Sequence, residues 1–513
     1  MSDHPIQIRV WADEGPGRAP EQRVGVLRER LPQTAVCLSG GGTRSMAATV
    51  GQLRGLAACG LLDRVGYLSC VSGSAWAVVP YLYAADATER LGSVTRPEHL
   101  TLASLDRLSS RSLLQPATHS FRDTLESLMA AGVVRPDEVW IRAVGEMFLS
   151  PTGLYNPVDP VGFGPALDSV VSGAVGRADP APRCHRPQAD RPFPVVHAAL
   201  TWPETRSAAQ QRLPFEYTPL YVGSPQRRVL RDPQAGARTV GGTLVEALGF
   251  GCDAPRAEVD ADGCVGVPAP RPFTLGHMIG ASSAFNTPDR DVRGYPHALY
   301  WTLPAVEGEP CAVNDLFTDG GDVDNLALLG MLRRRIPAIV VFINSVWPLA
   351  LDYDPRQWPE GSQIDSAVPP LFGQPSPRWP NNRVFAQSAY LEVVSAWQAA
   401  KRAGHPLVAC TRLTVEPNAW WGIDGGWEVS VCWVYNDRVP RWEAGLSEEV
   451  RHVFASGTGQ TPDPALVRFP HYRTVGENPG ALTRLTPRQV NLLAELAGWG
   501  VLESRDALQA VLG

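Results

Sequence analysis

The sequence predicts an α/β fold of three layers, in which helices cover both faces of a mainly parallel central sheet. Two stretches lead to this prediction. In residues 34–85 and again in residues 314–345, a short apolar run is followed by a glycine-containing turn, a helical segment and a second apolar run. Buried parallel strands read as continuous apolar runs, and a helix usually connects two of them. We therefore expect at least two β-α-β units in one sheet.

The first unit contains two strands whose ends carry small residues. A strand over Thr34–Ser39 runs into Gly40, Gly41 and Gly42, and a strand over Val65–Val71 runs into the sequence SGSAW, which begins at Ser72. Between them, apolar residues recur at helical spacing. Parallel strands joined by a right-handed crossover end at the same edge of a sheet. We therefore expect the glycine loop and Ser72 to lie side by side.

The rest of the chain is expected to add further strands and helices to one large domain. Residues 1–33 are interpreted as a polar lead-in and residues 34–513 as the domain. Residues 86–191 are interpreted as a helical and loop insertion that forms a cap or lid, with simple packing helices as the alternative for its helical part. Further strands are expected at Phe193–Leu200, Leu316–Thr318, Ile336–Asn344 and Val429–Tyr435, and helices at Gly241–Gly251, Thr274–Ala284, Leu326–Arg334, Phe385–Gly404 and Leu485–Leu502.

Composition excludes several classes of function. The 513-residue chain has a net charge of −6 and one lysine, Lys401, so no basic patch for nucleic acid is expected. Its nine cysteines are scattered without metal-ligand spacing, which favours free thiols in a reducing compartment and no metal site. We see neither a signal peptide nor a run of about 20 apolar residues. A cytoplasmic protein, at most peripheral at a membrane, is expected.

Three of the turns together carry the chemistry of acyl transfer. A serine at a sharp strand-to-helix turn exposes its hydroxyl, and bare glycine amides can bind an oxyanion. The serine also needs a base. Asp319, in an Asp-Gly-Gly turn at the end of a strand, can supply it in a Ser–Asp dyad. None of the ten histidines lies in a comparable turn; His277 and His297 are nearest in character, and we interpret them as structural.

Each motif alone has a simpler interpretation. Ser72 could be a helix N-cap, and Ser74 is a rival nucleophile. Asp319 could belong to an ordinary turn, with the acidic residues 315, 322 and 324 as competitors. Arg44, next to the glycine loop, could pair with a carboxylate. The occurrence of all these motifs in order, at strand ends, favours a site.

The motifs SGGGTR at 39–44, SGSAW at 72–76 and TDGG at 318–321 carry a resemblance to a known family. They resemble the patatin-like phospholipases and, more closely, the catalytic domain of cytosolic phospholipases of the A2 type and fungal lysophospholipases. The blocks FEYTPLYVGS at 215–224, IGASSAF at 279–285 and PNNRVF at 380–385 are similar to further parts of that domain. The resemblance spans residues 33–385.

The resemblance implies a role for each matching residue. Ser72 would be the nucleophile and Asp319 the base, while the amides of Gly41 and Gly42 would bind the oxyanion. Arg44 would meet substrate phosphate or steady the site. No metal or organic cofactor is implied. The chain departs from the family at position 70, where Cys70 replaces the glycine that usually stands two residues before the nucleophile.

We therefore expect a hydrolase that cleaves acyl esters of phospholipids or lysophospholipids through an acyl-enzyme. One alternative is a transacylase, or an esterase with a Ser-His-Asp triad. The other is a catalytically silent protein of the same fold that binds lipid or a partner, and Cys70 is the feature that favours it. The acyl position, head group and oligomeric state stay open.

Overall fold

The computed structural model describes residues 6–513 except for a set of short segments. These segments are residues 25, 26, 28, 30, 133, 164–182, 205–209, 256–257, 269–271, 286–293, 304–311, 456–462, 464 and 475–483. Part of the expected lid in residues 86–191 therefore lies outside the described residues.

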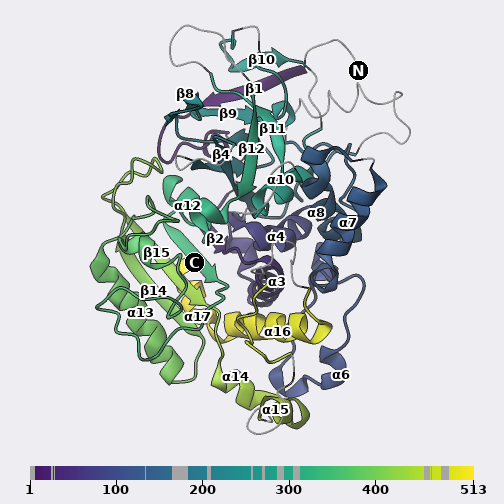
Figure 1. Cartoon of the computed structure of the whole chain (residues 1–513). Coiled ribbons are helices and arrows are strands. Elements are labelled where there is room, and N and C mark those ends of the chain that lie inside the picture. The colour runs from purple at the N-terminus through teal and green to yellow at the C-terminus, as the bar shows by residue number, and fades with distance from the viewer. Residues whose placement is uncertain are drawn as a thin grey trace.

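Five parallel strands form the centre of one large sheet (Figure 1). In spatial order they are β4 (Phe193–Trp202), β3 (Tyr67–Val71), β2 (Thr34–Leu38), β13 (Ala338–Ile343) and β15 (Glu428–Tyr435). All five are apolar and largely buried, as parallel strands covered on both faces should be. The predicted β-α-β unit over residues 34–85 is present, with α3 (Gly42–Ala58) as its crossover helix.

The flanks of the sheet are antiparallel, so the expectation of a mainly parallel sheet holds only for its centre. The flanking strands are β14 (Leu407–Thr414) at one side and β5 (Gln211–Tyr217), β6 (Tyr221–Gly223), β9 (Thr243–Glu246), β1 (Ile6–Ala12) and β10 (Cys264–Val267) at the other, with β11 (His297–Tyr300) and β12 (Val313–Asp319) beside β4. Some flanking strands follow each other closely in the chain, such as β5 and β6, whereas β1 pairs with β9 and β10 from more than 200 residues away.

Helices pack on both faces of the sheet, which confirms the predicted α/β class. Strand residues alternate between two apolar cores: Val36 and Leu38 belong to one, Ala35 and Cys37 to the other. The first core is closed by α3, α4 (Ala75–Tyr83), α10 (Leu275–Ser282), α16 (Pro487–Glu503) and α17 (Arg505–Leu512), and the second by α11 (Gly321–Asp324), α12 (Leu329–Arg333) and α13 (Gln387–Arg402).

The described part of residues 86–191 is helical and packs beside α4 and α10. Its helices are α5 (Ala87–Leu91), α6 (Leu102–Leu105), α7 (Phe121–Ala131) and α8 (Val139–Phe148). Phe148 stacks on Trp76 of α4 with ring centroids 4.0 Å apart, and Trp140 donates to the carbonyl of Gly280 in α10. That this segment acts as a cap stays a prediction.

Two smaller groups of elements complete the chain. A separate hairpin consists of β7 (Arg228–Asp232) and β8 (Gly236–Val240). The short helices α1 (Pro20–Arg23), α14 (Pro440–Gly445) and α15 (Glu448–Ala455) lie outside the sheet. The region Gly241–Gly251 was expected to be a helix, and this is wrong. It holds β9 and a single 3-10 turn, because a short apolar run does not distinguish a strand from a helix.

Residues before the first central strand take part in the sheet and its buried charges. β1 pairs with β9 and β10, and Glu21 of α1 accepts a hydrogen bond from the fully buried Arg334 at 2.8 Å. The same guanidinium forms a 2.7 Å ion pair with Glu216 of β5. A buried cation requires such partners, so these contacts fasten the lead-in to the domain.

The expectation that the cysteines are free thiols is wrong for one pair. Cys410 and Cys432 are directly opposite each other on the antiparallel strands β14 and β15 and form a disulfide. Spacing along the sequence could not indicate this pair, because the pairing of the two strands brings the residues together. Six other cysteines are free among the described residues.

We predict that the contact between α3 and α16 is sensitive to single methyl groups. A Cβ at Gly51 would lie 2.1 Å from the carbonyl oxygen of Ala494, whereas Gly500 of α16 has open space around it. Gly51→Ala should therefore lower the free energy of unfolding by about 1–3 kcal/mol through overpacking. Gly500→Ala should raise it by about 0.5–1 kcal/mol. Denaturant unfolding measures both, and equal effects would contradict the close packing.

Candidate active site

The ends of two strands meet on β4. β3 pairs with the first half of β4, where Val71 is opposite His197, and β12 pairs with the second half, where Asp319 is opposite Ala198. β3 is parallel to β4 and β12 is antiparallel, so their C-terminal ends point toward each other. We expected Asp319 to arrive at the same rim as Ser72. The structure brings the two residues together by this head-to-head arrangement instead.

Ser72 is held at a sharp turn between β3 and α4. Its φ is +56°, a value that is rare for a residue with a side chain. Its amide donates to the hydroxyl of Ser282 at 2.9 Å, and that hydroxyl donates to the carbonyl of His197 at 2.7 Å. Ser74, the rival nucleophile, is fully buried and donates to the carbonyls of Leu38 and Val71. Ser74 thus shapes the turn.

Ser72 and Asp319 are in direct contact. The hydroxyl Oγ of Ser72 donates to Oδ2 of Asp319 at 2.7 Å, while Oδ1 of Asp319 accepts from the amide of Gly321 at 2.8 Å. The two side chains lie in a nearly dry environment, with Ser72 7% and Asp319 4% exposed. Burial, and then the negative charge of Asp322, raise the pKa of Asp319 to about 7. The carboxylate can therefore accept a proton near neutral pH.

The glycine loop lies against the serine turn, backbone to backbone. A Cβ at Gly73 would lie 2.1 Å from the carbonyl oxygen of Gly42, so only glycine allows this approach. Gly41 and Gly42 have φ values of +139° and +61°. Within the described residues, neither of their amides takes part in a hydrogen bond to the protein. Both amides are thus free to bind a negatively charged oxygen.

Arg44 supports the loop from within the protein. It is 6% exposed, and its guanidinium donates to the carbonyls of Asn344 at 3.1 Å and Tyr472 at 2.5 Å. Its Nη2 atom fills the space where a Cβ of Gly41 would be. Burial lowers the pKa of Arg44 to about 10, partly offset by Asp365. Of the two expected roles, these contacts fit the one that steadies the site.

Histidines do not contact Ser72 in the described residues. His277 bonds to Thr274 at the start of α10, and His297 bonds to the carboxylate of Glu204. A serine–histidine pair does exist between Ser69 and His197, at 2.8 Å. Ser69 is fully buried and also donates to the carbonyl of Ala327, so this pair is structural.

Sequence reasoning gave no role to two residues at this site, Ser282 and Asn325, and named Asp322 only as a competitor of Asp319. The hydroxyl of Ser282 accepts a hydrogen bond from the amide of Ser72, and the negative charge of Asp322 raises the pKa of Asp319. The carbonyl of Asn325 accepts a hydrogen bond from the amide of Gly40 at 3.0 Å. Ser282 lies in the block IGASSAF, which was noted as part of the family resemblance. No simple pattern would have indicated Asn325.

Two further searches gave no candidates in the described part of the chain. No group of three or more histidine, cysteine, aspartate or glutamate side chains there could hold a metal ion. None of its helices is both long and apolar enough to cross a bilayer.

Comparison with known proteins gives short local matches. The mouse cytosolic phospholipase A2 zeta is 54% identical over 62 residues, which is 11% of this chain and 7% of that protein. The human cytosolic phospholipase A2 beta is 47% identical over 55 residues, or 10% and 7% of the two chains. The matched stretches thus span a small part of either relative. No protein-family profile matches the chain.

Among solved structures, that of the human GIVD cytosolic phospholipase A2 is similar with a TM-score of 0.46. The sequences are 16% identical, and the match covers 99% of this chain and 66% of that one.

We predict that Asp319 destabilises the folded protein at alkaline pH. Its pKa is about 7 in the folded state and lower when exposed, so folding favours the protonated form and stability falls as pH rises from about 4 to 7. Asp319→Asn should therefore raise the free energy of unfolding at pH 8 by about 2–4 kcal/mol and have little effect at pH 4.5. Asp190→Asn, at a carboxylate that is 80% exposed, is the control. An effect that does not depend on pH would contradict the raised pKa.

Proposed function

We propose that the chain hydrolyses acyl esters of lipids, as a phospholipase A or lysophospholipase, with Ser72 as nucleophile and Asp319 as base. The observation that carries the proposal is the 2.7 Å hydrogen bond from Ser72 Oγ to Asp319 Oδ2 at a turn of positive φ. A serine is a weak nucleophile until a neighbouring base accepts its proton. A carboxylate with a pKa of about 7 is suited to that task near neutral pH.

The mechanism follows from the contacts of these residues. Ser72 Oγ attacks the ester carbonyl as its proton moves to Asp319 Oδ2. The amides of Gly41 and Gly42 donate to the oxyanion of the tetrahedral intermediate, and Arg44 keeps their loop in place. The intermediate collapses to an acyl-enzyme while Asp319 returns the proton to the leaving alcohol. Water, activated by Asp319, then releases the fatty acid and restores Ser72.

The lipid class of the substrate rests on a separate support, the short matches to cytosolic phospholipases A2. A phospholipid or lysophospholipid carries the acyl ester that the mechanism requires. Such a substrate resides in membranes, so we propose contact with a membrane surface from the cytoplasm, without a spanning segment. The products of the assay described below would identify the preferred head group and acyl position.

Specific contacts distinguish the proposed hydrolase from two of the alternative functions, the triad esterase and the silent protein. A Ser-His-Asp triad requires a histidine next to the nucleophile, and the described histidines bond elsewhere. A silent protein of the same fold was favoured by Cys70. That side chain is fully buried in the sheet, and the turn at Ser72 forms beside it with the hydroxyl against Asp319. A transacylase would use the same dyad with an alcohol in place of water.

We predict that Ser72→Ala and Asp319→Asn each lower hydrolysis by about a thousand-fold or more, because both act in one proton transfer. The assay is mass spectrometry of the products that the purified protein releases from a mixed-lipid extract. Ser110→Ala, at an exposed serine, is the control. A fluorophosphonate probe should label the wild type at Ser72. Full hydrolysis by Ser72→Ala, or labelling of another serine, would contradict the proposal.

We predict that kcat/KM falls toward low pH in a single step. The base must be ionised, so kcat/KM should rise with pH and reach half its plateau near pH 7, the pKa of Asp319. Asp322→Asn removes a negative charge that raises this pKa, so it should move the midpoint to lower pH. Rate measurements from pH 4.5 to 9 on a short-chain ester test this. A midpoint near pH 4, or one unmoved by Asp322→Asn, speaks against Asp319 as the base.

A further inference from the structure

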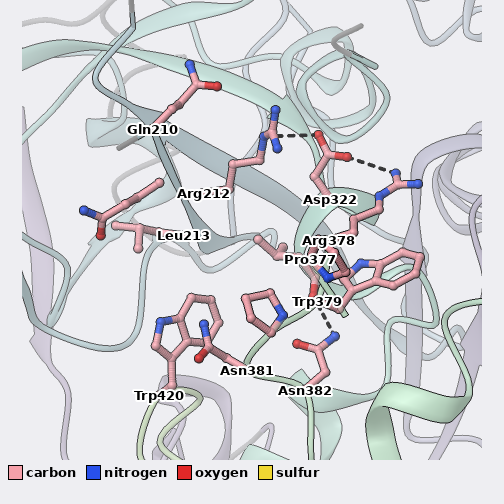
Figure 2. Close-up of a pocket in the computed structure, with 13 residues that line it drawn as sticks. Gln210, Arg212, Leu213, Asp322, Pro377, Arg378, Trp379, Asn381, Asn382 and Trp420 are labelled. Atoms are coloured by element: carbon pink, nitrogen blue, oxygen red, sulfur yellow. Dashed lines mark hydrogen bonds and ion pairs between the residues drawn. The ribbon is translucent and has the colours of Figure 1, made fainter. Parts of the chain in front are cut away.

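A cavity of about 220 Å³ lies beside α11, the short helix that follows the turn of Asp319 (Figure 2). It opens between the start of β5, the helix α11 and the loop of residues 377–382. Its lining includes Arg212, Asp322, Arg378, Trp379, Asn381 and Trp420. Figure 2 shows the two arginines on either side of Asp322, with Trp420 across the cavity. The proposed mechanism does not use this space, although the first residues of the block PNNRVF at 380–385 line it.

Positive charge exceeds negative charge at this cavity. Arg378 Nη2 is 2.9 Å from Oδ1 of Asp322, and Arg212 Nε is 3.4 Å from Oδ2, so two cations share one carboxylate. The side chain of Asp322 is 7% exposed, while those of Arg212 and Arg378 are 35% and 44% exposed. Both Asp322 Oδ2 and Arg212 Nε are buried without a hydrogen-bond partner in the described residues. These two atoms are each other's ion-pair partners at 3.4 Å, so the capacity to bind a ligand lies in the exposed parts of the two guanidinium groups.

A third arginine adds to the positive field. Arg228 of β7 lies over the ring of Trp420, with its guanidinium carbon 4.2 Å from the ring centroid. Burial and the charge of Arg333 lower the pKa of Arg228 to about 10. Its Nη1 atom is also buried without a hydrogen bond in the described part of the chain.

The walls of the cavity are held in place by the turn and by α11. The indole of Trp379 donates to the carbonyl of Gly321 at 2.9 Å, and Asn382 donates to the carbonyl of Val323 at 2.9 Å. Asn382 also accepts from the indole of Trp421 at 3.2 Å. A cavity with fixed walls binds a ligand without first having to be ordered.

We propose that this cavity is a binding site for a phosphate-type anion. Guanidinium groups bind phosphate through paired, charge-assisted hydrogen bonds, and two of them converge here with a third behind Trp420. The anion could be free phosphate or the phosphate of a lipid head group, because both offer the same chemistry to the arginines.

The site stands independently of the proposed function, but the two are coupled if that function holds. Asp322 follows Asp319 by three residues, and the charges of Asp322 and Arg378 both act on Asp319. An anion bound between the arginines would add negative charge near the base and keep it protonated to higher pH. A bound anion would thus move the midpoint of the pH dependence of kcat/KM to higher pH.

Isothermal titration calorimetry with two probes tests the site. The probes are inorganic phosphate and glycerophosphoethanolamine, a soluble head group that has no acyl ester. We expect at least one to bind the wild type, and Arg212→Gln and Arg378→Gln each to weaken that binding about ten-fold or more. Arg412→Gln is the matched control, since Arg412 is 73% exposed on the edge strand β14 and does not line the cavity. The Ser72→Ala variant should bind as the wild type does, whether or not Ser72 is catalytic.

Each outcome counts for or against the site. Binding of phosphate alone assigns a free anion, and binding of glycerophosphoethanolamine assigns a lipid head group; both support it. No binding of either probe to the wild type overturns it, as does equal weakening by Arg412→Gln, which would show a general effect of charge. If a glutamine variant does not fold, displacement of phosphate from the wild type by sulfate, but not by chloride at equal ionic strength, supports the site. Equal displacement by both salts overturns it.

Discussion

The meeting of β3 and β12 on β4 is the constraint on which the candidate site depends. Each strand uses half of the same edge of β4, so the residues that follow β3 and end β12 must face each other. The contact between Ser72 and Asp319 is thus built into the hydrogen-bond register of the sheet. The glycine loop adds to this, because the absence of a Cβ at Gly73 lets its backbone touch the serine turn. A rigid backbone frame positions side chains better than a mobile loop would.

Burial at this site changes the acidity of Asp319. Asp319 is buried, and the negative charge of Asp322 acts on it as well, so the carboxylate holds a proton more readily than usual. Arg44 lies on the other side of the glycine loop, bonded to backbone carbonyls. The site therefore combines a carboxylate with a raised pKa, two backbone amides without hydrogen bonds in the described residues, and a nearby buried cation. Each of these features costs stability when taken alone, which is typical of functional sites.

Much of the fold could be predicted from the sequence, and what could not has physical reasons. The apolar runs at Thr34–Ser39 and Ile336–Asn344 were predicted to be buried strands, and each contains a parallel strand of the sheet. β14 was missed, because its burial alternates in the structure while its sequence LVACTRLT does not alternate between apolar and polar residues. Ser72 and Asp319 were indicated by motif, yet the antiparallel direction of β12 was not, because the pattern of a strand does not show which way it runs. The ion pairs of Asp322 join residues far apart in the chain and were beyond sequence reasoning.

The packing of α16 on α3 has a consequence for the newly made chain. The glycine loop opens α3, but the opposite side of that helix is closed by residues that leave the ribosome far later. Until they emerge, the side of α3 that carries Gly51 and Gly55 has no cover. A chain that ends before Pro487 would lack α16 and leave this part of the core exposed. The contact between the two helices can therefore form only after nearly the whole chain has been made.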